Sequence, residues 1–389
     1  MKLEGVAVLG VGMTRFASHR ARTLAELARE AGLAALADAG ISFREVGEAF
    51  VGYVQGTAMT GVKIMKEFGL TGLPIQRIEN ASATGSAAFR EACLAVAGGH
   101  YDIAMVLGFD KMTSMIQSGT AGTAPENMED AILPAAFFAM WATRRMHERG
   151  TKPEHLAKIA AKNFNNGAKN PMSQRQPSEL VTPEKVLQSR MVAWPLTTMM
   201  SCPIGDGAAC AIVGRADLAK KLHPDRPVVR VVASTLQSER YERGHVFQGP
   251  VVGPARMSID SSRAVYEEAG LGPADLDLVQ VHDAFVIEEL EYYELLGLCK
   301  TGEAEQCIDR GDFELGGRCA VSTDGGLIAR GHPGGPTGLA QIWETTLQLR
   351  GEAGARQVRR RKTGEIARTG LCHMMGGGSV CVIHILQRD

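Results

Sequence analysis

The chain has 389 residues, of which 45% are hydrophobic and 22% charged, a composition usual for a globular protein long enough for two domains. The formal net charge of −1 gives no electrostatic reason to expect binding to nucleic acid or to an anionic membrane surface. No apolar run reaches about 18 residues, so we expect no membrane-spanning helix.

The cysteines and the N-terminal segment bear on metal binding and on location. None of the eight cysteines forms a Cys-x-x-Cys pair, so we expect no metal site. Residues 1–10 are typical of a strand, and they are too short and too acidic for a signal peptide. The sequence therefore predicts reduced thiols and a cytoplasmic location.

The pattern strand, amphipathic helix, strand occurs twice along the chain. Each helix is followed by an Ala-Gly pair, which is a signal for a helix C-terminus. The segments are 6–9, 24–39 and 49–54 in the first half, and 228–232, 261–269 and 278–282 in the second. Alternating strands and helices at these spacings predict two related, layered α/β halves.

A middle segment interrupts this pattern. Residues 112–200 are rich in Met, Asn, Gln and Pro and contain several helical patterns, which favours an inserted loop domain covering a site. A surface elaboration without function is the alternative. We therefore expect an N-terminal half made of residues 1–111 and 201–225, and a C-terminal half over residues 226–389.

A short turn in the first half of the chain has the features of a candidate reactive site. Residues 79–87 are small and, after Asn80, uncharged, and they lead directly into a helical pattern over 87–96. A polar side chain at such a turn lies near a helix N-terminus, where free N–H groups and the helix dipole stabilise negative charge. Ser82 is therefore a candidate nucleophile.

Three later segments also place reactive groups next to strand or helix ends, where α/β folds position their sites. They are His282-Asp283-Ala284-Phe285, Gly331-His332-Pro333-Gly334, and Leu371-Cys372-His373 followed by Gly376-Gly377-Gly378. Histidines beside glycine turns often only cap a backbone group. The glycine run precedes a strand rather than a helix, which argues against a dinucleotide-binding loop.

Taken together and in this order, the four segments resemble the thiolase superfamily over essentially the whole chain. His282, in place of the Asn of many thiolases, brings the sequence nearer to the sterol-carrier-protein-type thiolases and thiolase-like proteins. The resemblance implies an α/β, thiolase-like fold with two duplicated layered α/β/α halves and an inserted loop domain.

The resemblance also implies roles for individual residues. Ser82 would hold the acyl group, and His332 would take the nucleophile's proton and help bind a thioester oxygen. His282 would orient a water or donate to an oxyanion. The N–H of Ser82 and the backbone near Gly376 would form a second oxyanion hole. Coenzyme A would be a co-substrate, with no covalently bound cofactor and no metal.

The sequence departs from the family pattern at the acid/base position. Met374 stands where many thiolases carry the cysteine of a Cys-x-Gly motif. His373 resembles the histidine of the sterol-carrier type, and its neighbour Cys372 is a candidate substitute. Ala284 stands where that type can carry a cysteine. The acid/base assignment is thus open between His373 and Cys372.

The serine at position 82 is the larger departure. A thiol has a pKa of about 8.5, which a helix N-terminus and a histidine can lower below neutrality. A serine hydroxyl starts several units higher, and a helix dipole contributes at most about 2 kcal/mol. Ser82 would need His332 as a true general base.

Three functions follow as hypotheses. The first is thiolysis of a β-ketoacyl-CoA, or the reverse Claisen condensation, with Ser82 as an engineered Cys→Ser replacement or a weak natural variant. The second is a nucleophile-free retro-aldolase acting on a β-hydroxyacyl-CoA, ranked lower because such aldolases rely on tyrosines whereas His282 and His332 are thiolase-like. The third is a non-catalytic acyl-CoA or lipid-binding subunit.

The resemblance implies two kinds of protein partner as well. The first is a second copy of the chain in a homodimer. The second is a separate small zinc-ribbon/OB-fold subunit, since the chain has no zinc motif of its own.

Overall fold

The computed structural model describes residue 3 and residues 5–114, 134–240 and 255–389, so residues 115–133 of the expected loop domain lie outside the described residues. The strands are β1 (Val6–Met13), β2 (Glu48–Gly52), β3 (Ile75–Ile78), β4 (Ile103–Lys111), β5 (Met191–Ala193), β6 (Leu196–Thr197), β7 (Asp206–Arg215), β8 (Val229–Ser238), β9 (Leu278–Gln280), β10 (Ala320–Val321), β11 (Thr369–Gly376) and β12 (Val380–Arg388). The helices are α1 (Leu24–Ala39), α2 (Thr60–Met65), α3 (Thr84–Ala97), α5 (Pro134–Arg149), α6 (Pro153–Gly167), α7 (Pro183–Leu187), α8 (Ala216–Leu222), α9 (Ala255–Ala269), α10 (Val286–Leu295), α11 (Ala304–Asp309), α12 (Gly326–Arg330) and α13 (Thr337–Arg350).

The main sheet shows the duplication directly. Its strand order is β10-β9-β11-β12-β8-β1-β7-β4-β2-β3. Strands β1, β2, β3, β4 and β7 of the first half occupy the same relative places as β8, β9, β10, β11 and β12 of the second. In the described part of the chain, the two sets of strands pair with each other where β1 meets β8, through Ala7↔Arg230 and Val8↔Val229. The predicted α/β fold with two related halves is confirmed.

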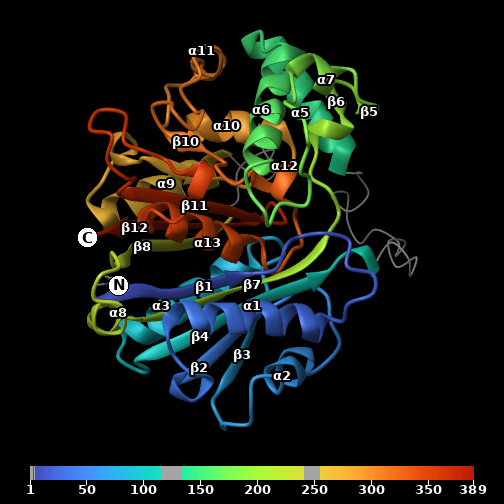
Figure 1. Cartoon of the computed structure of the whole chain (residues 1–389). Coiled ribbons are helices and arrows are strands. Elements are labelled where there is room, and N and C mark those ends of the chain that lie inside the picture. Colours follow the sequence, from blue (N-terminus) through green and yellow to red (C-terminus); the bar gives the residue numbers. More distant parts are fainter. Residues whose placement is uncertain (1–2, 4, 115–133, 241–254) are drawn as a thin grey trace.

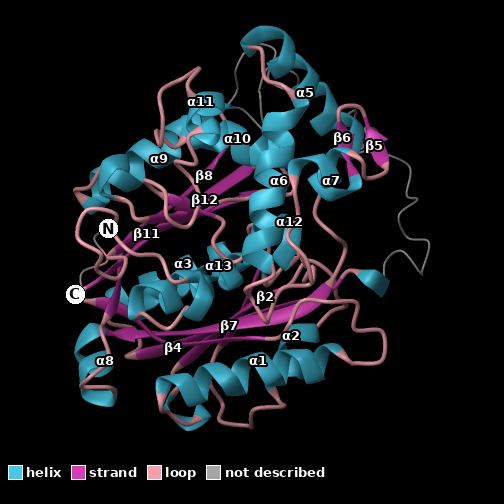
Figure 2. Ribbon diagram, turned by 45° about the horizontal axis from the view of Figure 1, so that its top comes forward, coloured by secondary structure: helices cyan, strands magenta, loops and turns pink. Residues whose placement is uncertain are grey.

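Helices lie between and outside the two sets of strands (Figures 1 and 2). Helices α3 and α13 occupy the central layer, where side chains such as Phe89 and Leu339 share a buried apolar cluster with both halves. Helix α1 covers the outer face of the first half, and α9 and α10 cover that of the second. The central layer thus brings the helix that follows Ser82 against the second half of the chain.

The expected helix ends are confirmed at the Ala-Gly pairs. Gly40 has φ 69° and Gly270 has φ 65°, so each glycine ends its helix in the left-handed conformation that residues with a Cβ avoid. At the other end of α1, the Thr23 side chain and Glu26 form a capping box. Helix α8 lies within the stretch that joins the two halves.

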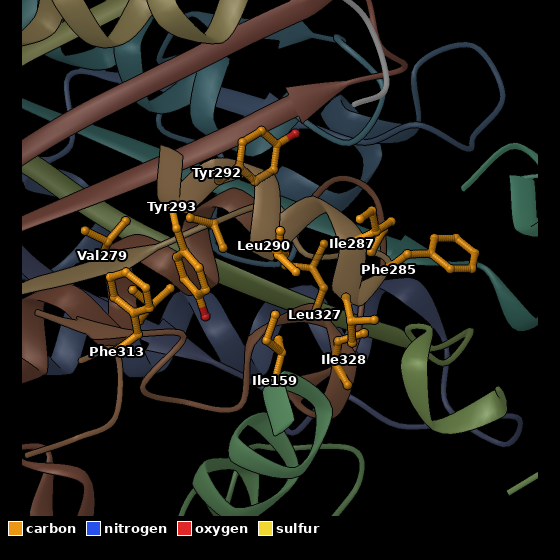
Figure 3. Close-up of a cluster of buried hydrophobic side chains, with 14 of the residues drawn as sticks. Ile159, Val279, Phe285, Ile287, Leu290, Tyr292, Tyr293, Phe313, Leu327 and Ile328 are labelled. Carbon is orange, nitrogen blue, oxygen red and sulfur yellow. The ribbon is translucent and has the colours of Figure 1, made fainter. Parts of the chain in front are cut away.

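Part of the expected loop domain packs directly over the second half. Helices α5, α6 and α7 and the β5–β6 hairpin lie at the outer side of α10 and α12 (Figure 1). Figure 3 shows Ile159 of α6 among the apolar side chains of α10 and α12, including Leu290 and Leu327. Among the described residues, no helix combines the length and the apolar character needed to cross a bilayer.

The crossing of α3 and α13 needs glycine. A Cβ on Gly85 would lie 2.5 Å from the carbonyl oxygen of Gly335, a backbone atom that cannot turn aside. We expect Gly85→Ala to lower the free energy of unfolding by about 1–3 kcal/mol through overpacking. Thermal unfolding measures the effect, with Gly316→Ala as the control because a Cβ there meets nothing within 4 Å. An unchanged melting temperature for Gly85→Ala would contradict the close approach.

Candidate active site

The turn that carries Ser82 is built by the backbone between β3 and α3. Ala81 has φ 46°, a left-handed conformation that reverses the chain directly before Ser82. The backbone N–H of Ala81 donates to the Glu79 side chain at 2.7 Å, which holds this conformation. Helix α3 begins at Thr84, so Ser82 lies at its N-terminus as predicted. Its Oγ lies 3.1 Å from Nε2 of His332.

His332 is arranged to accept the serine proton. Its Nδ1 lies 2.9 Å from the hydroxyl oxygen of Thr337, and that hydroxyl donates to the carbonyl of Pro333. Because the Thr337 hydroxyl proton is used in that bond, the hydroxyl oxygen accepts a hydrogen bond from Nδ1–H of His332. Nε2 of His332 then carries no proton, and its lone pair is directed at Ser82. Burial, and then the nearby His282 and Arg330, hold the pKa of His332 well below its usual range, so the ring is neutral and able to accept a proton.

His282 stands beside this pair. It follows β9, and its ring makes an edge-to-face contact with that of His332 at a centroid distance of 5.3 Å. Its Nδ1 lies 3.0 Å from a carboxylate oxygen of Glu288, and the other oxygen of Glu288 accepts the backbone N–H of Phe285 at 3.1 Å. Glu288 is fully buried in the first turn of α10. Its contact fixes the orientation of the His282 ring.

The glycine-rich segment packs against the Ser82 turn. A Cβ on Gly376 would lie 2.3 Å from the carbonyl oxygen of Asn80, so only glycine permits this approach. Met374, two residues earlier on the same face of β11, packs against Ala83 of the Ser82 turn and Ala87 of α3. The structure therefore brings together Ser82, His332, His282 and the backbone at Gly376.

Cys372 and His373 are adjacent on β11 and so point to opposite faces of the strand. The Cys372 thiol lies 3.1 Å from Thr345 of α13, and burial raises its pKa to about 12. His373 lies under α10 with its ring 4.2 Å from that of Tyr292, and burial lowers its pKa to about 3. Both ring nitrogens of His373 are without a hydrogen-bond partner among the described residues. Neither side chain changes its charge near neutral pH.

Sequence reasoning missed three residues that shape the site. Thr337 and Glu288 orient the two histidines, and Asp110 of β4 accepts the backbone N–H of Gly335 at 2.5 Å and so holds the loop after His332. An acidic residue at the third position of a helix, as Glu288 is in α10, was the available signal, since it is typical of a helix start. Nothing in the sequence spacing indicated Asp110.

Asp283, next to His282, faces away from the site. It is fully buried and accepts the backbone N–H groups of Leu327 and Ile328 in α12. Its carboxylate also accepts from the Asn163 side chain of α6 at 2.9 Å. Burial, and then the nearby Glu289, raise its pKa well above its usual range. Asp283 thus links the loop that carries His282 to α6 and α12.

Comparison with known proteins shows the family of the chain. Residues 6–217 match the family described as the thiolase N-terminal domain, and residues 243–388 match the thiolase C-terminal domain-like family. The chain is 37% identical over 410 residues to sterol carrier protein 2 of Rattus norvegicus, covering 99% of this chain and 72% of the relative. It is 36% identical over 384 residues to the benzoylsuccinyl-CoA thiolase subunit BbsB of Thauera aromatica, covering 97% of this chain and 96% of the relative.

Solved structures agree on the fold. The structure described as the Ltp2-ChsH2(DUF35) aldolase superposes with a TM-score of 0.84 over 99% of this chain and 98% of its own, at 23% identity. The family matches together span most of the chain. The chain therefore belongs to the thiolase family, near the sterol-carrier-protein-type members, and is an acyltransferase of the thiolase type acting on acyl-CoA carbon–carbon bonds.

Proposed function

We propose that this protein catalyses thiolysis of a β-ketoacyl-CoA, or the reverse Claisen condensation, with Ser82 as the nucleophile. The observation that carries the proposal is the 3.1 Å contact between Ser82 Oγ and His332 Nε2 at the N-terminus of α3. The relative from Thauera aromatica is named as a thiolase of a CoA thioester, which supports an acyl-CoA substrate for this chain. Coenzyme A is then the co-substrate.

The proposed reaction proceeds in two steps, transfer of the acyl group to Ser82 and then to coenzyme A. His332 Nε2 takes the Ser82 proton as Oγ bonds to the β-keto carbon, and the bond between the α and β carbons then breaks. The acyl group remains on Ser82 while acetyl-CoA leaves as its enolate and is protonated at the α carbon. The coenzyme A thiol then attacks the acyl group, and His332 returns its proton to Ser82 as an acyl-CoA two carbons shorter than the substrate forms.

Negative charge on the reacting oxygens requires donors. The N–H of Ser82, at the start of α3, and the backbone at Gly376, which packs against the same turn, form one oxyanion hole in this proposal. In this proposal His332 faces the second oxygen, that of the thioester.

Wild-type turnover tests the proposal directly. The protein is incubated with acetoacetyl-CoA and coenzyme A, and separately with a β-hydroxyacyl-CoA, and products are separated by chromatography. We expect slow formation of acetyl-CoA from the first mixture. Release of an aldehyde or ketone from the second mixture, with no acetyl-CoA from the first, would instead establish the retro-aldolase. Tight coenzyme A binding without turnover in either mixture would establish a binding subunit.

Thr337 provides a finer test of the general base. We expect Thr337→Val to lower kcat for thiolysis about tenfold, because valine cannot accept Nδ1–H and the tautomer that accepts the Ser82 proton is no longer favoured. Steady-state kinetics measure this, with Thr337→Ser as the control that keeps the hydroxyl. Equal losses in the two variants would show that packing, and not the hydroxyl, explains the effect.

We also propose that the protein acts as a homodimer and with a separate small zinc-ribbon/OB-fold subunit. Strand β3 forms the edge of the described sheet, with Gln76 and Arg77 exposed, and it leads directly into the Ser82 turn. The name of the Thauera aromatica relative identifies it as a subunit. Light scattering of the purified chain tests the dimer, and co-purification from the native source tests the second subunit. A monomer in solution would count against the homodimer, and the absence of a co-purifying small protein would count against the second subunit.

A further inference from the structure

The reaction needs a group that exchanges a proton with the α carbon, a role that Ser82 and His332 do not fill in the proposed reaction. Ala284 has no titratable side chain, and the Cys372 thiol is directed to Thr345 on α13. His373 is enclosed under α10 against Tyr292. His282 is the remaining candidate next to His332.

We propose that Glu288 and His282 form the acid/base dyad, with Nε2 of His282 exchanging the proton at the substrate's α carbon and Glu288 acting as its positioning residue. The inference rests on the proposed function, since it assigns a step of that reaction. It gives His282 the role that the sequence left open between His373 and Cys372.

The contacts of His282 carry the argument. Its Nδ1 is engaged by Glu288 at 3.0 Å, and Glu288 is itself held by the Phe285 N–H, so the ring is fixed from one edge. Its Nε2, on the opposite edge of the ring, is buried and has no hydrogen-bond partner among the described residues. A buried polar atom without a partner is costly, and such atoms recur at functional sites.

His282 interacts electrostatically with both of the other two histidines. It contributes to lowering the pKa of both His332 and His373, in each case after burial. The Glu288 carboxylate compensates the charge that the His282 ring gains on protonation. Among the residues that the structure describes, His282 is the one of these three histidines with a carboxylate within hydrogen-bond distance.

The proton balance closes over both halves of the reaction. The His282 imidazolium donates its Nε2 proton to the α carbon of the departing enolate and becomes neutral, with Nδ1–H still directed to Glu288. In the second half, Nε2 takes the thiol proton of coenzyme A as the sulfur attacks the acyl group. His332 handles only the Ser82 proton, so the two histidines never compete for one proton.

Deuterium exchange at the α carbon isolates this step from the nucleophile. Wild-type protein is incubated with acetyl-CoA in D₂O without free coenzyme A, and deuterium in the acetyl group is measured by mass spectrometry. We expect exchange above the buffer rate, a loss of about 100-fold in His282→Gln, and a loss of about tenfold to 100-fold in Glu288→Gln. The loss should appear in the maximal exchange rate and not in the half-saturating acetyl-CoA concentration.

Glu289→Gln is the matched control. Glu289 is the next residue of α10, is equally buried, and pairs with Lys162 at 2.7 Å, away from His282. Its replacement also removes a buried carboxylate, so we expect a lower melting temperature but exchange close to that of the wild type. Exchange measured well below both melting temperatures then separates positioning from simple loss of stability.

Three results would overturn the dyad. The first is that the wild type catalyses no exchange, and the second is that Glu288→Gln exchanges as fast as the wild type. The third is that His373→Gln loses exchange while His282→Gln keeps it. The proposed function fails in a different way, through the absence of thiolysis while exchange at the α carbon persists.

Discussion

Ser82→Cys should raise kcat for thiolysis of acetoacetyl-CoA at least about 100-fold. A thiol at a helix N-terminus beside a histidine is readily ionised, whereas the serine hydroxyl must lose its proton to His332 within the attack itself. The cysteine also forms a thioester intermediate, which transfers its acyl group to coenzyme A more readily than an oxyester. Steady-state rates of wild type and variant, measured with the same substrate, decide the question.

An exposed thiol elsewhere controls for nonspecific reactivity. Ser42→Cys places a cysteine at an exposed position and should leave the rate unchanged. Iodoacetamide should abolish the gain in Ser82→Cys, and bound acyl-CoA should protect against it. A Ser82→Cys variant that cleaves acetoacetyl-CoA no faster than the wild type would remove Ser82 from the acyl-transfer step. Equal rates of β-hydroxyacyl-CoA cleavage by the wild type and Ser82→Cys would favour the retro-aldolase.

His332→Asn should lower kcat for thiolysis about 1,000-fold or more in the wild-type background. The serine depends on a general base, and His332 Nε2 is the base within 3.1 Å of Oγ. In the Ser82→Cys background the same replacement should cost less, because a thiol loses its proton more easily. A double-mutant cycle over positions 82 and 332 measures this difference as a coupling free energy.

One outcome of the double-mutant cycle would contradict the role of His332 as general base. Equal losses in the two backgrounds would mean that His332 acts on the thioester oxygen rather than as the base for residue 82. His147→Asn provides the control for histidine replacement, since His147 lies exposed on α5. Its activity should equal that of the wild type in both backgrounds.

The local features of this protein follow from short stretches of its sequence. Ala-Gly pairs end helices at Gly40 and Gly270 because glycine adopts positive φ without steric cost, and this depends on one residue and its neighbours. The repeated pattern of strands and helices indicated two related halves, because the periodicity of hydrophobic residues can be read from short stretches of the sequence. Three of the four segments lie at the ends of strands or helices, as expected, whereas Cys372 and His373 of the fourth lie inside β11.

How these segments meet depends on the packing of elements that are far apart in the sequence. Ser82 and His332 are 250 residues apart in sequence, and their contact exists because α3 and α13 share the central layer. The faces to which Cys372 and His373 point follow from the register of β11 against β9 and β12, which the alternation of side chains alone cannot specify. Glu288 and Thr337 orient the histidines through hydrogen bonds set by packing, and burial fixes the direction of each pKa shift. Residue types and spacing therefore indicated the chemistry, while the partner of each side chain depended on contacts between segments distant in the chain.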